Sequence, residues 1–314
     1  MPKILESKSI YYNNVNLIAK PGIVKSRSEI PKRLDLIFAS PMAAICGPKF
    51  VKTALELGLS VCLHRFCPIK EELEIFKNNY NYSSRIWSAV GLDDNQRILE
   101  LYTAGCRNFL IDTANGYLES VVRFTYDLYN SDLNENKVLN IIVGNIHSNE
   151  GLRLYRGIQN IGLRVGIANG FGCDTKSMTS VNRGQITEIM ECYESNDNSV
   201  IYADGGISCP AYASLAFATG ADRIMLGGYF SSAEESENVI NGEYKFWGSA
   251  SYKQQELSGS RKSHSEGNVK EVKGIKPLKV LVDELWGGIS SAISYSGKNK
   301  IENFIGSGTL EIKI

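Results

Sequence analysis

The sequence predicts an α/β fold, a single-domain (β/α)8 barrel, on three observations. Eight short apolar runs recur at nearly even intervals, segments with helical periodicity lie between them, and the length of 314 residues suits one barrel. A doubly wound open sheet is the alternative architecture, but eight evenly spaced repeats favour closure. We therefore expect residues 1–314 to form one TIM-barrel domain.

The predicted strands are rich in Val, Ile, Leu or Phe without strict alternation, which is typical of parallel strands buried on both faces. They cover 34–40, 59–65, 85–91, 107–113, 140–145, 163–169, 199–205 and 222–228. Helical periodicity is clearest over 47–58, 93–105, 118–129 and 208–220. Functional groups of such barrels lie at the C-terminal ends of the strands. The polar residues and glycines that follow these runs are therefore the candidate site.

The segment 229–275 is too long for a simple turn after the eighth strand, and its second half is polar. Long loops of compact domains are usually lids or unstructured segments. Both an active-site lid and a solvated surface loop remain open on this pattern.

Composition excludes several classes of function. The chain carries 34 basic and 34 acidic side chains, so no overall field attracts nucleic acid or an anionic membrane. The N-terminus lacks the apolar region of a signal peptide, which predicts a cytoplasmic protein. Seven cysteines without a CxxC pair argue against a disulfide framework, and three histidines without an HxxxH pair argue against a zinc site.

Cys173 lies in the glycine-rich stretch "GIANGFGCDTKSMTSVNRGQ" at 166–185, directly after the sixth predicted strand. A thiolate is favoured by backbone N–H groups, and glycine-rich backbone supplies them. Thr175 is close enough in sequence to share the pocket and relay a proton. A nucleophilic and a merely structural cysteine both remain open on these residues alone.

Two glycine pairs, "DGG" at 204–206 and "GG" at 227–228, end the last two predicted strands. Barrels frequently bind phosphate there through backbone amides, and Asp204 could accept hydrogen bonds from a ribose diol. Tight βα turns would explain either pair alone. The two pairs together favour a nucleotide.

Motifs over most of the chain resemble the purine nucleotide oxidoreductases, the family of GMP reductase and IMP dehydrogenase. They are "KSRSEI" at 25–30, "DTANGY" at 112–117, "VGN" at 143–145, the Cys173 loop, "YADGGISCPA" at 202–211, "MLGG" at 225–228, "FWGSAS" at 246–251, "SEGN" at 265–268 and "LWGGISSAISYSG" at 285–297. The chain has no regulatory insertion after the second strand and no Arg-Tyr flap in 229–275. The resemblance is therefore closer to GMP reductase.

The resemblance implies NADPH-dependent deamination of a guanine nucleotide by a homotetramer. Cys173 would attack purine C2, and Thr175 and Glu266 would protonate the departing ammonia. The implied substrate contacts are Asp204, Gly205, Gly206, Gly227, Gly228, Ser249, Ser251 and the position of Phe171. The implied cofactor contacts are Arg65, Asp112, Asn115, Gly116 and Asn145, and a K+ ion is expected near Gly170 and Cys173. The alternatives are an oxidation like that of IMP dehydrogenase and an inactive nucleotide-binding relative.

The chain departs from the family around these residues. "ANGFGC" at 168–173 replaces the usual "GPGS" loop, so that Phe171 stands where a serine faces phosphate. Arg65 replaces a lysine, Asp174 a hydroxyl residue and Ser263 an arginine. Because a benzyl group cannot donate to phosphate, we expect a purine nucleotide other than GMP to be preferred. The alternative is that Phe171 turns away and glycine amides still bind phosphate.

Overall fold

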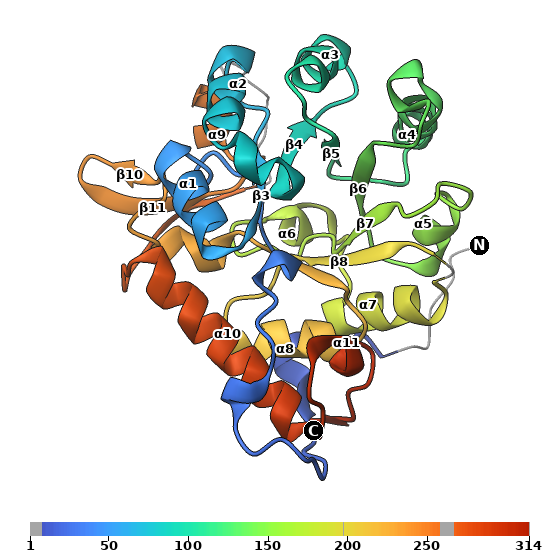
Figure 1. The fold of residues 1–314 in the computed structure, drawn as a ribbon, viewed down its shortest axis with the longest axis vertical. Coiled ribbons are helices and arrows are strands. Elements are labelled where there is room, and N and C mark those ends of the chain that lie inside the picture. Colours follow the sequence, from blue (N-terminus) through green and yellow to red (C-terminus); the bar gives the residue numbers. More distant parts are fainter. Residues whose placement is uncertain (1–7, 197, 258–266, 314) are drawn as a thin grey trace.

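Eight parallel strands form a closed barrel in the computed structural model, which describes residues 8–196, 198–257 and 267–313 (Figure 1). The strands are β2 (Ile37–Ala39), β3 (Ser60–Leu63), β4 (Ile86–Val90), β5 (Asn108–Asp112), β6 (Asn140–Ile146), β7 (Gly162–Val165), β8 (Val200–Asp204) and β9 (Arg223–Leu226). Pairing of β2 with β9 closes the ring. Each strand falls within or overlaps one of the eight predicted runs, which confirms the (β/α)8 prediction.

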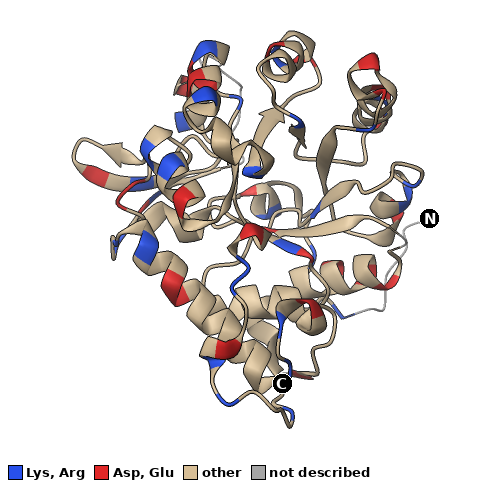
Figure 2. Ribbon diagram, viewed as in Figure 1, with Lys and Arg blue, Asp and Glu red and all other residues tan. Residues whose placement is uncertain are grey.

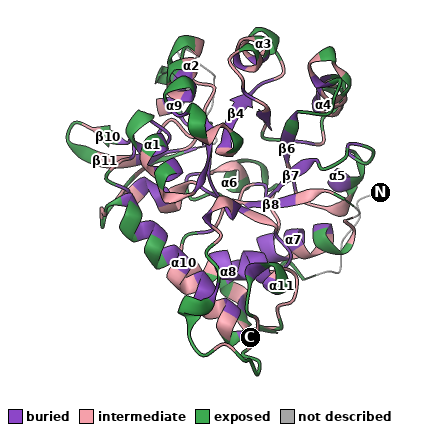
Figure 3. Cartoon of the chain, in the orientation of Figure 1, coloured by how far each residue is buried: buried purple, intermediate pink, exposed green. Residues whose placement is uncertain are grey.

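Helices surround the barrel and bury one face against it, while their outer faces are exposed (Figure 3). They are α1 (Pro48–Leu57), α2 (Ile69–Asn78), α3 (Asn95–Thr103), α4 (Glu119–Asn130), α5 (Asn149–Arg153), α7 (Gln185–Glu194), α8 (Pro210–Ala218) and α10 (Leu278–Tyr295). The four helical segments predicted from periodicity correspond to α1, α3, α4 and α8. Helix α1 shows why its ends fall where they do: Pro48 occupies the first turn and Gly58, at φ +102°, ends the helix.

The barrel interior is filled by side chains and is not a pore. Its core is formed by Phe38, Cys62, Trp87, Ala89, Leu110, Ile142, Tyr202 and Met225. The ring of Phe38 meets Tyr202 edge-on, with the centroids 5.1 Å apart. A larger apolar layer packs between strands and helices. The two layers hold the strand ends, and therefore the loops that follow them, in fixed positions.

The segment 229–275 contains structure that the sequence analysis did not predict. An antiparallel sheet is formed by β10 (Val239–Ile240), β11 (Glu243–Trp247) and β12 (Val269–Glu271). Helix α9 (Tyr252–Leu257) lies between β11 and β12 in the sequence. This insertion packs against the Cys173 loop. Asn268 N donates to Gly172 O at 3.2 Å, and Cys173 and Gly267 form an isolated antiparallel β-bridge. The insertion therefore lies next to the candidate nucleophile.

The two ends of the described chain meet. Strand β1 (Val15–Leu17) pairs antiparallel with β13 (Leu310–Ile312), which follows α11 (Ile301–Phe304). Charged residues of both signs are interspersed along the outer helices (Figure 2), in keeping with the net charge of zero. No helix within the described ranges is long and apolar enough to cross a membrane.

Candidate active site

A cavity of about 1230 Å³ opens at the C-terminal ends of the barrel strands. It brings together most of the predicted site residues: Arg65, Asp112, Asn145, Gly170, Phe171, Cys173, Thr175, Asp204, Gly205, Gly206, Gly227, Gly228 and Ser249. Asn115, Gly116 and Ser251 do not line it. Glu266 and Ser263 lie outside the described residues.

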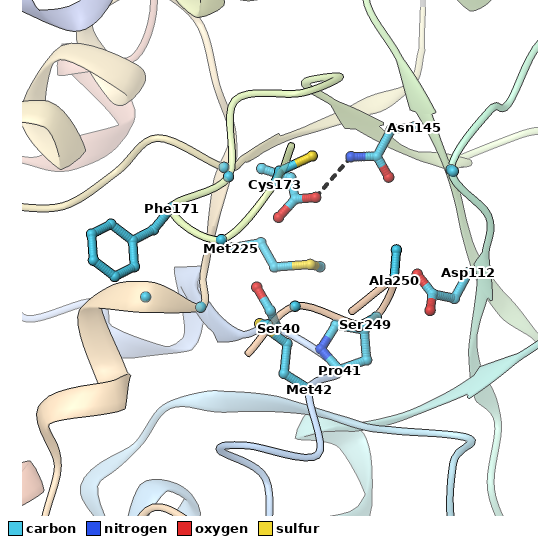
Figure 4. Close-up of a pocket in the computed structure, with 18 of the residues that line it drawn as sticks. Ser40, Pro41, Met42, Asp112, Asn145, Phe171, Cys173, Met225, Ser249 and Ala250 are labelled. Atoms are coloured by element: carbon cyan, nitrogen blue, oxygen red, sulfur yellow. Dashed lines mark hydrogen bonds between the residues drawn. The ribbon is translucent and has the colours of Figure 1, made fainter. Parts of the chain in front are cut away.

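Cys173 and Thr175 are in direct contact within this cavity. The Cys173 thiol lies 3.2 Å from Thr175 Oγ1, and the thiol is only partly buried. A turn closed by Cys173 N donating to Gly170 O, at 3.1 Å, presents the side chain, and Thr175 begins the short helix α6 (Thr175–Thr179). Figure 4 shows the side chains of Cys173 and Met225 extending in the same direction. The structure therefore places a thiol and a hydroxyl in contact, and their catalytic roles stay predictions.

Arg164 connects the two acidic residues of the site, and the sequence analysis missed it. Its guanidinium is buried and bonds Asp112 Oδ1 through Nη1, at 2.6 Å, and Asp204 Oδ2 through Nη2, at 2.8 Å. Burial alone would lower the pKa of Arg164, but the carboxylates of Asp204 and Asp112 raise it above the ordinary value. The only sequence signal was a charged residue within the apolar run of β7. Asp112 and Asp204 therefore form one buried charge network with Arg164.

Asn145 extends this network toward the Cys173 loop. Its side-chain amide donates to Asp204 Oδ2 at 2.8 Å and to Gly166 O at 2.6 Å (Figure 4). Gly116 lies behind it, with Gly116 N donating to Asn145 O at 2.8 Å. Asn115 is exposed, and its Oδ1 accepts from Tyr117 N. In this structure Gly116 supports Asn145 from outside the cavity, and Asn115 shapes its own turn.

The glycine turns after β8 and β9 allow three loops to meet. Gly205 and Gly206 have φ of +88° and +73°, which disfavour other residues. A Cβ on Gly205 would lie 3.1 Å from Gly170 N, and one on Gly228 would lie 2.8 Å from Phe171 Cβ. These turns therefore bring bare backbone against the Cys173 loop, whatever ligand they bind.

Phe171 turns its ring to the rim of the site. The side chain is 49% exposed and packs against Phe246, with ring centroids 5.6 Å apart. Lys270 Nζ lies 4.4 Å from the ring centroid and donates to Phe171 O. Figure 4 shows the ring directed away from Cys173. The ring is therefore turned toward the rim rather than toward Cys173, and phosphate binding by the glycine amides stays a prediction.

Two serines of the insertion have different places. Ser249 lines the cavity, whereas Ser251 is fully buried and its Oγ accepts from Gln254 N at 3.2 Å. That bond caps the first turn of α9. Ser251 therefore does not line the cavity and affects the site only by stabilising the first turn of α9.

Arg65 occupies the opposite part of the cavity, on the loop after β3. Its Nε is buried and has no hydrogen-bond partner in the described part of the chain. The neighbouring His64 is not in the cavity lining, and burial, with a smaller effect of Arg97, lowers its pKa to about 4. His64 is therefore neutral near pH 7, and Arg65 is the cationic group on this side.

A metal centre is not indicated at this site. Across residues 8–196, 198–257 and 267–313, no group of three or more His, Cys, Asp or Glu could hold a metal ion. All seven cysteines are free thiols. The groups that the cavity itself presents include the Cys173 thiol, the Thr175 hydroxyl and the charged side chains of Asp112, Arg164 and Asp204.

The closed barrel and the polar cavity at the C-terminal ends of its strands are typical of a barrel enzyme. The chain belongs to the IMP dehydrogenase / GMP reductase family, whose domain model matches residues 22–312.

Relatives place the chain closer to the reductase branch of this oxidoreductase family. It is 27% identical to GMP reductase 2 of Bos taurus over 329 residues, covering 96% of this chain and 93% of the relative. It is 32% identical to GMP reductase of Phytophthora infestans over 332 residues, covering 96% and 90%. The match to inosine-5'-monophosphate dehydrogenase of Chlorobaculum parvum, at 29% identity, covers 69% of this chain and 48% of that protein.

Proposed function

We propose that the protein catalyses NADPH-dependent reductive deamination of a guanine nucleotide, releasing a hypoxanthine nucleotide and ammonia. The observation that carries the proposal is the contact of Cys173 with Thr175, in a cavity lined by glycine turns. The match to GMP reductases over nearly the whole chain supports the direction of the reaction.

The proposed reaction uses Cys173 as a covalent catalyst. Its sulfur bonds to purine C2, and the exocyclic amine leaves as ammonia after protonation through Thr175 and Glu266. NADPH, when bound, supplies the hydride that reduces C2 of the thioimidate, after which the carbon–sulfur bond breaks and the thiol is restored. Overall, the guanine nucleotide, NADPH and two protons give the hypoxanthine nucleotide, NADP+ and ammonium.

Asp204 suits the ribose of the substrate. Asn145 and Arg164 both bond to its Oδ2, which leaves Oδ1 able to accept from a ribose hydroxyl. The amides after Gly205 and Gly227 face the same cavity and are proposed to bind phosphate. Ser249 and the backbone beside Phe171 complete the proposed substrate contacts.

The Arg65 side of the cavity fits an anionic cofactor. The unpartnered buried Nε of Arg65 is a donor that a phosphate or carboxamide oxygen of NADPH could satisfy, and Asp112 and Asn145 lie toward the reacting centre. The carbonyl of Gly170 and the backbone of Cys173 are the proposed ligands of a K+ ion. The homotetramer and the cytoplasmic location stay predictions.

Residues 229–275 are proposed to act as a lid. Phe246, Ser249, Ala250 and Glu271 from this segment line the cavity. Closure of such a segment would exclude water from the hydride step. The "SEGN" motif with Glu266 belongs to the same segment, which is why its carboxyl is proposed as the acid.

The reaction is tested by incubating purine nucleotides with NADPH, NADH, NAD+ or NADP+ and measuring nicotinamide absorbance and ammonia. Oxidation of NADPH with equal release of ammonia from a guanine nucleotide is expected. Reduction of NAD+ by IMP would instead assign the dehydrogenase reaction, and binding without turnover would assign an inactive relative.

The role of Glu266 is tested by Glu266→Gln. We expect kcat for ammonia release to fall at least tenfold while the KM for the nucleotide changes little, because glutamine keeps the size but cannot supply a proton. Glu243→Gln, on the same insertion and outside the cavity lining, is the matched control and should keep the parental kcat. Equal kcat in Glu266→Gln and the parent would place the acid elsewhere.

A further inference from the structure

Glu188, on the inward face of α7, is fully buried behind the Cys173 loop. A buried carboxyl is costly unless hydrogen bonds satisfy it. Asn169 Nδ2 donates to Glu188 Oε2 at 3.1 Å, and the backbone N–H of Ile167 also bonds to the carboxyl. Within the described residues, Oε1 has no partner. The hydrogen bonds of the Glu188 carboxyl are therefore made with the segment that leads to Cys173.

The segment held by Glu188 continues directly into the turn of the nucleophile. Asn169 precedes Gly170, whose carbonyl accepts from Cys173 N at 3.1 Å. On its other side, the backbone of Asn169 is within 3.3 Å of the position that a Cβ of Gly206 would take. The start of the cysteine loop is thus held between the glycine turn after β8 and the carboxyl of α7.

The surroundings of Glu188 favour its neutral form. Burial raises its pKa to about 9, with a smaller raising effect of Glu191 and a lowering effect of Arg183. The other titratable groups coupled to it are Tyr12, Tyr117 and Cys192, whose pKa values burial also raises. Near pH 7 the group is therefore a hydrogen-bonding carboxylic acid, and a neutral amide of the same shape can replace it.

We propose that Glu188 is a positioning residue, which fixes the geometry of the Cys173 nucleophile through hydrogen bonds to Asn169 and Ile167. Glu188 does not itself line the cavity, but both residues that it bonds, Ile167 and Asn169, do. Its effect on turnover rests on the proposed function, but its effect on the order of the loop does not. A small displacement of a reacting atom costs up to about a hundredfold in rate, so loosening this support should lower kcat.

The test compares Glu188→Leu, Glu188→Gln and Asn169→Ala with the parent. Amide hydrogen exchange of peptides covering 166–175 is measured first, and loss of the hydrogen bond should speed exchange roughly tenfold in Glu188→Leu and Asn169→Ala. Glu188→Gln should exchange like the parent. Steady-state kinetics should show kcat lowered about ten- to a hundredfold in Glu188→Leu and restored in Glu188→Gln.

The matched control is Glu191→Gln, the same change on the same helix. Glu191 bonds Arg183 and Asn149 N rather than the cysteine loop, so exchange over 166–175 and kcat should not change. The double variant Glu188→Leu/Asn169→Ala should be less impaired than the two single effects added together, because both single changes remove the same Glu188–Asn169 hydrogen bond. Should Glu188→Leu not fold, Asn169→Ala decides the matter alone.

The proposal is overturned if exchange over 166–175 in Asn169→Ala and Glu188→Leu equals that of the parent. It is also overturned if Glu188→Gln is as impaired as Glu188→Leu, since the carboxyl would then not act as a hydrogen-bond acceptor. If the parent turns over no nucleotide, the proposed reaction fails, and the exchange measurements still decide whether Glu188 holds the loop.

Discussion

Cys173 differs from the other cysteines in its surroundings rather than in its chemistry. Burial raises the pKa of Cys46 and Cys192 to about 12 and that of Cys67 and Cys106 to about 11, so these thiols stay protonated and inert. Cys173 is partly exposed in a cavity and contacts a hydroxyl. The position of Cys173 in the fold, rather than its residue type, therefore makes it the candidate nucleophile among the seven cysteines.

Replacing Cys173 by alanine should abolish turnover while leaving nucleotide binding within a few-fold of the parent. The thiol would form the covalent bond, whereas Asp204 and the backbone amides would hold the ligand. Turnover is followed by ammonia release and binding by calorimetry. Cys209→Ala, at the start of α8 and outside the cavity lining, is the control and should keep full activity. A Cys173→Ala protein with more than a few per cent of the parental rate would contradict covalent catalysis.

Replacing Phe171 by serine tests the altered phosphate loop. The change exchanges the packing of Phe171 on Phe246 for a hydroxyl next to Gly228, and a charge-assisted bond to phosphate is worth roughly 1.5–3 kcal/mol. We expect kcat/KM for GMP relative to guanosine to rise about tenfold or more. GMP, dGMP, GDP, GTP and guanosine are compared in both proteins. If GMP is already the best substrate of the parent and serine brings no gain, the loop was not altered for another ligand.

At the scale of elements, the site depends on close contact between loops that follow different strands. The turn after β8 meets the Cys173 loop at Gly205, and the insertion meets it at Gly172 and Cys173. At these contact points the loops meet through glycines and main-chain atoms. A change in one loop should therefore be felt in the next.

Gly205→Ala should lower kcat/KM at least tenfold, because the added Cβ lies 3.1 Å from Gly170 N and must displace the cysteine loop. Gly242→Ala is the matched control. Gly242 has a similar φ of +81° in the turn between β10 and β11, but nothing lies within 4 Å of its Cβ position. Both variants should lose about 1–2 kcal/mol of stability from backbone strain, measured by urea unfolding. Equal kinetics in the two variants would show that loop contact does not matter.

Sequence patterns predicted the strands that are buried on both faces and recur at regular intervals along the chain. The eight barrel strands are continuous apolar runs, and the cysteine loop and glycine turns are compositionally unusual. Arg164 and Glu188 were not recognised, because a charge inside an apolar strand or an acidic residue on an amphipathic helix does not show which partner it meets. The sheet of the insertion was missed because β10 has two residues and β12 three, and because β11 mixes charged and aromatic residues without a continuous apolar run. Arg164, Glu188 and this sheet all depend on contacts with residues that are distant in the sequence, which local patterns do not show.

At the scale of the whole molecule, buried carboxyls make stability depend on pH. An exposed glutamate has a pKa of 4.5, whereas burial raises the pKa of Glu188 to about 9. Between these two pH values Glu188 is therefore protonated in the folded protein and ionised in the unfolded chain. Its contribution is therefore fully present below about pH 4.5 and is lost as the pH rises toward 9. Arg183 opposes this effect and Glu191 adds to it.

The free energy of unfolding of the parent should fall relative to that of Glu188→Gln as the pH rises from 6 to 9. Urea unfolding at several pH values measures the difference between the two proteins. Glu191→Gln is the control, because hydrogen bonding to Arg183 keeps the pKa of Glu191 below its ordinary value and its effect should be constant over this range. A difference between parent and Glu188→Gln that does not change with pH would mean that Glu188 is ionised in the fold.

The pairing of β1 with β13 has a consequence for how the chain folds during synthesis. Val15 pairs with Ile312, so β1 leaves the ribosome about 300 residues before its partner strand β13. At roughly 5–20 residues per second, that interval is on the order of 15–60 s. Ile37 of β2 likewise waits for Ile224 of β9 before the ring closes. Strand β1 thus stays without its partner strand throughout that interval, which is when the nascent chain most needs protection from aggregation.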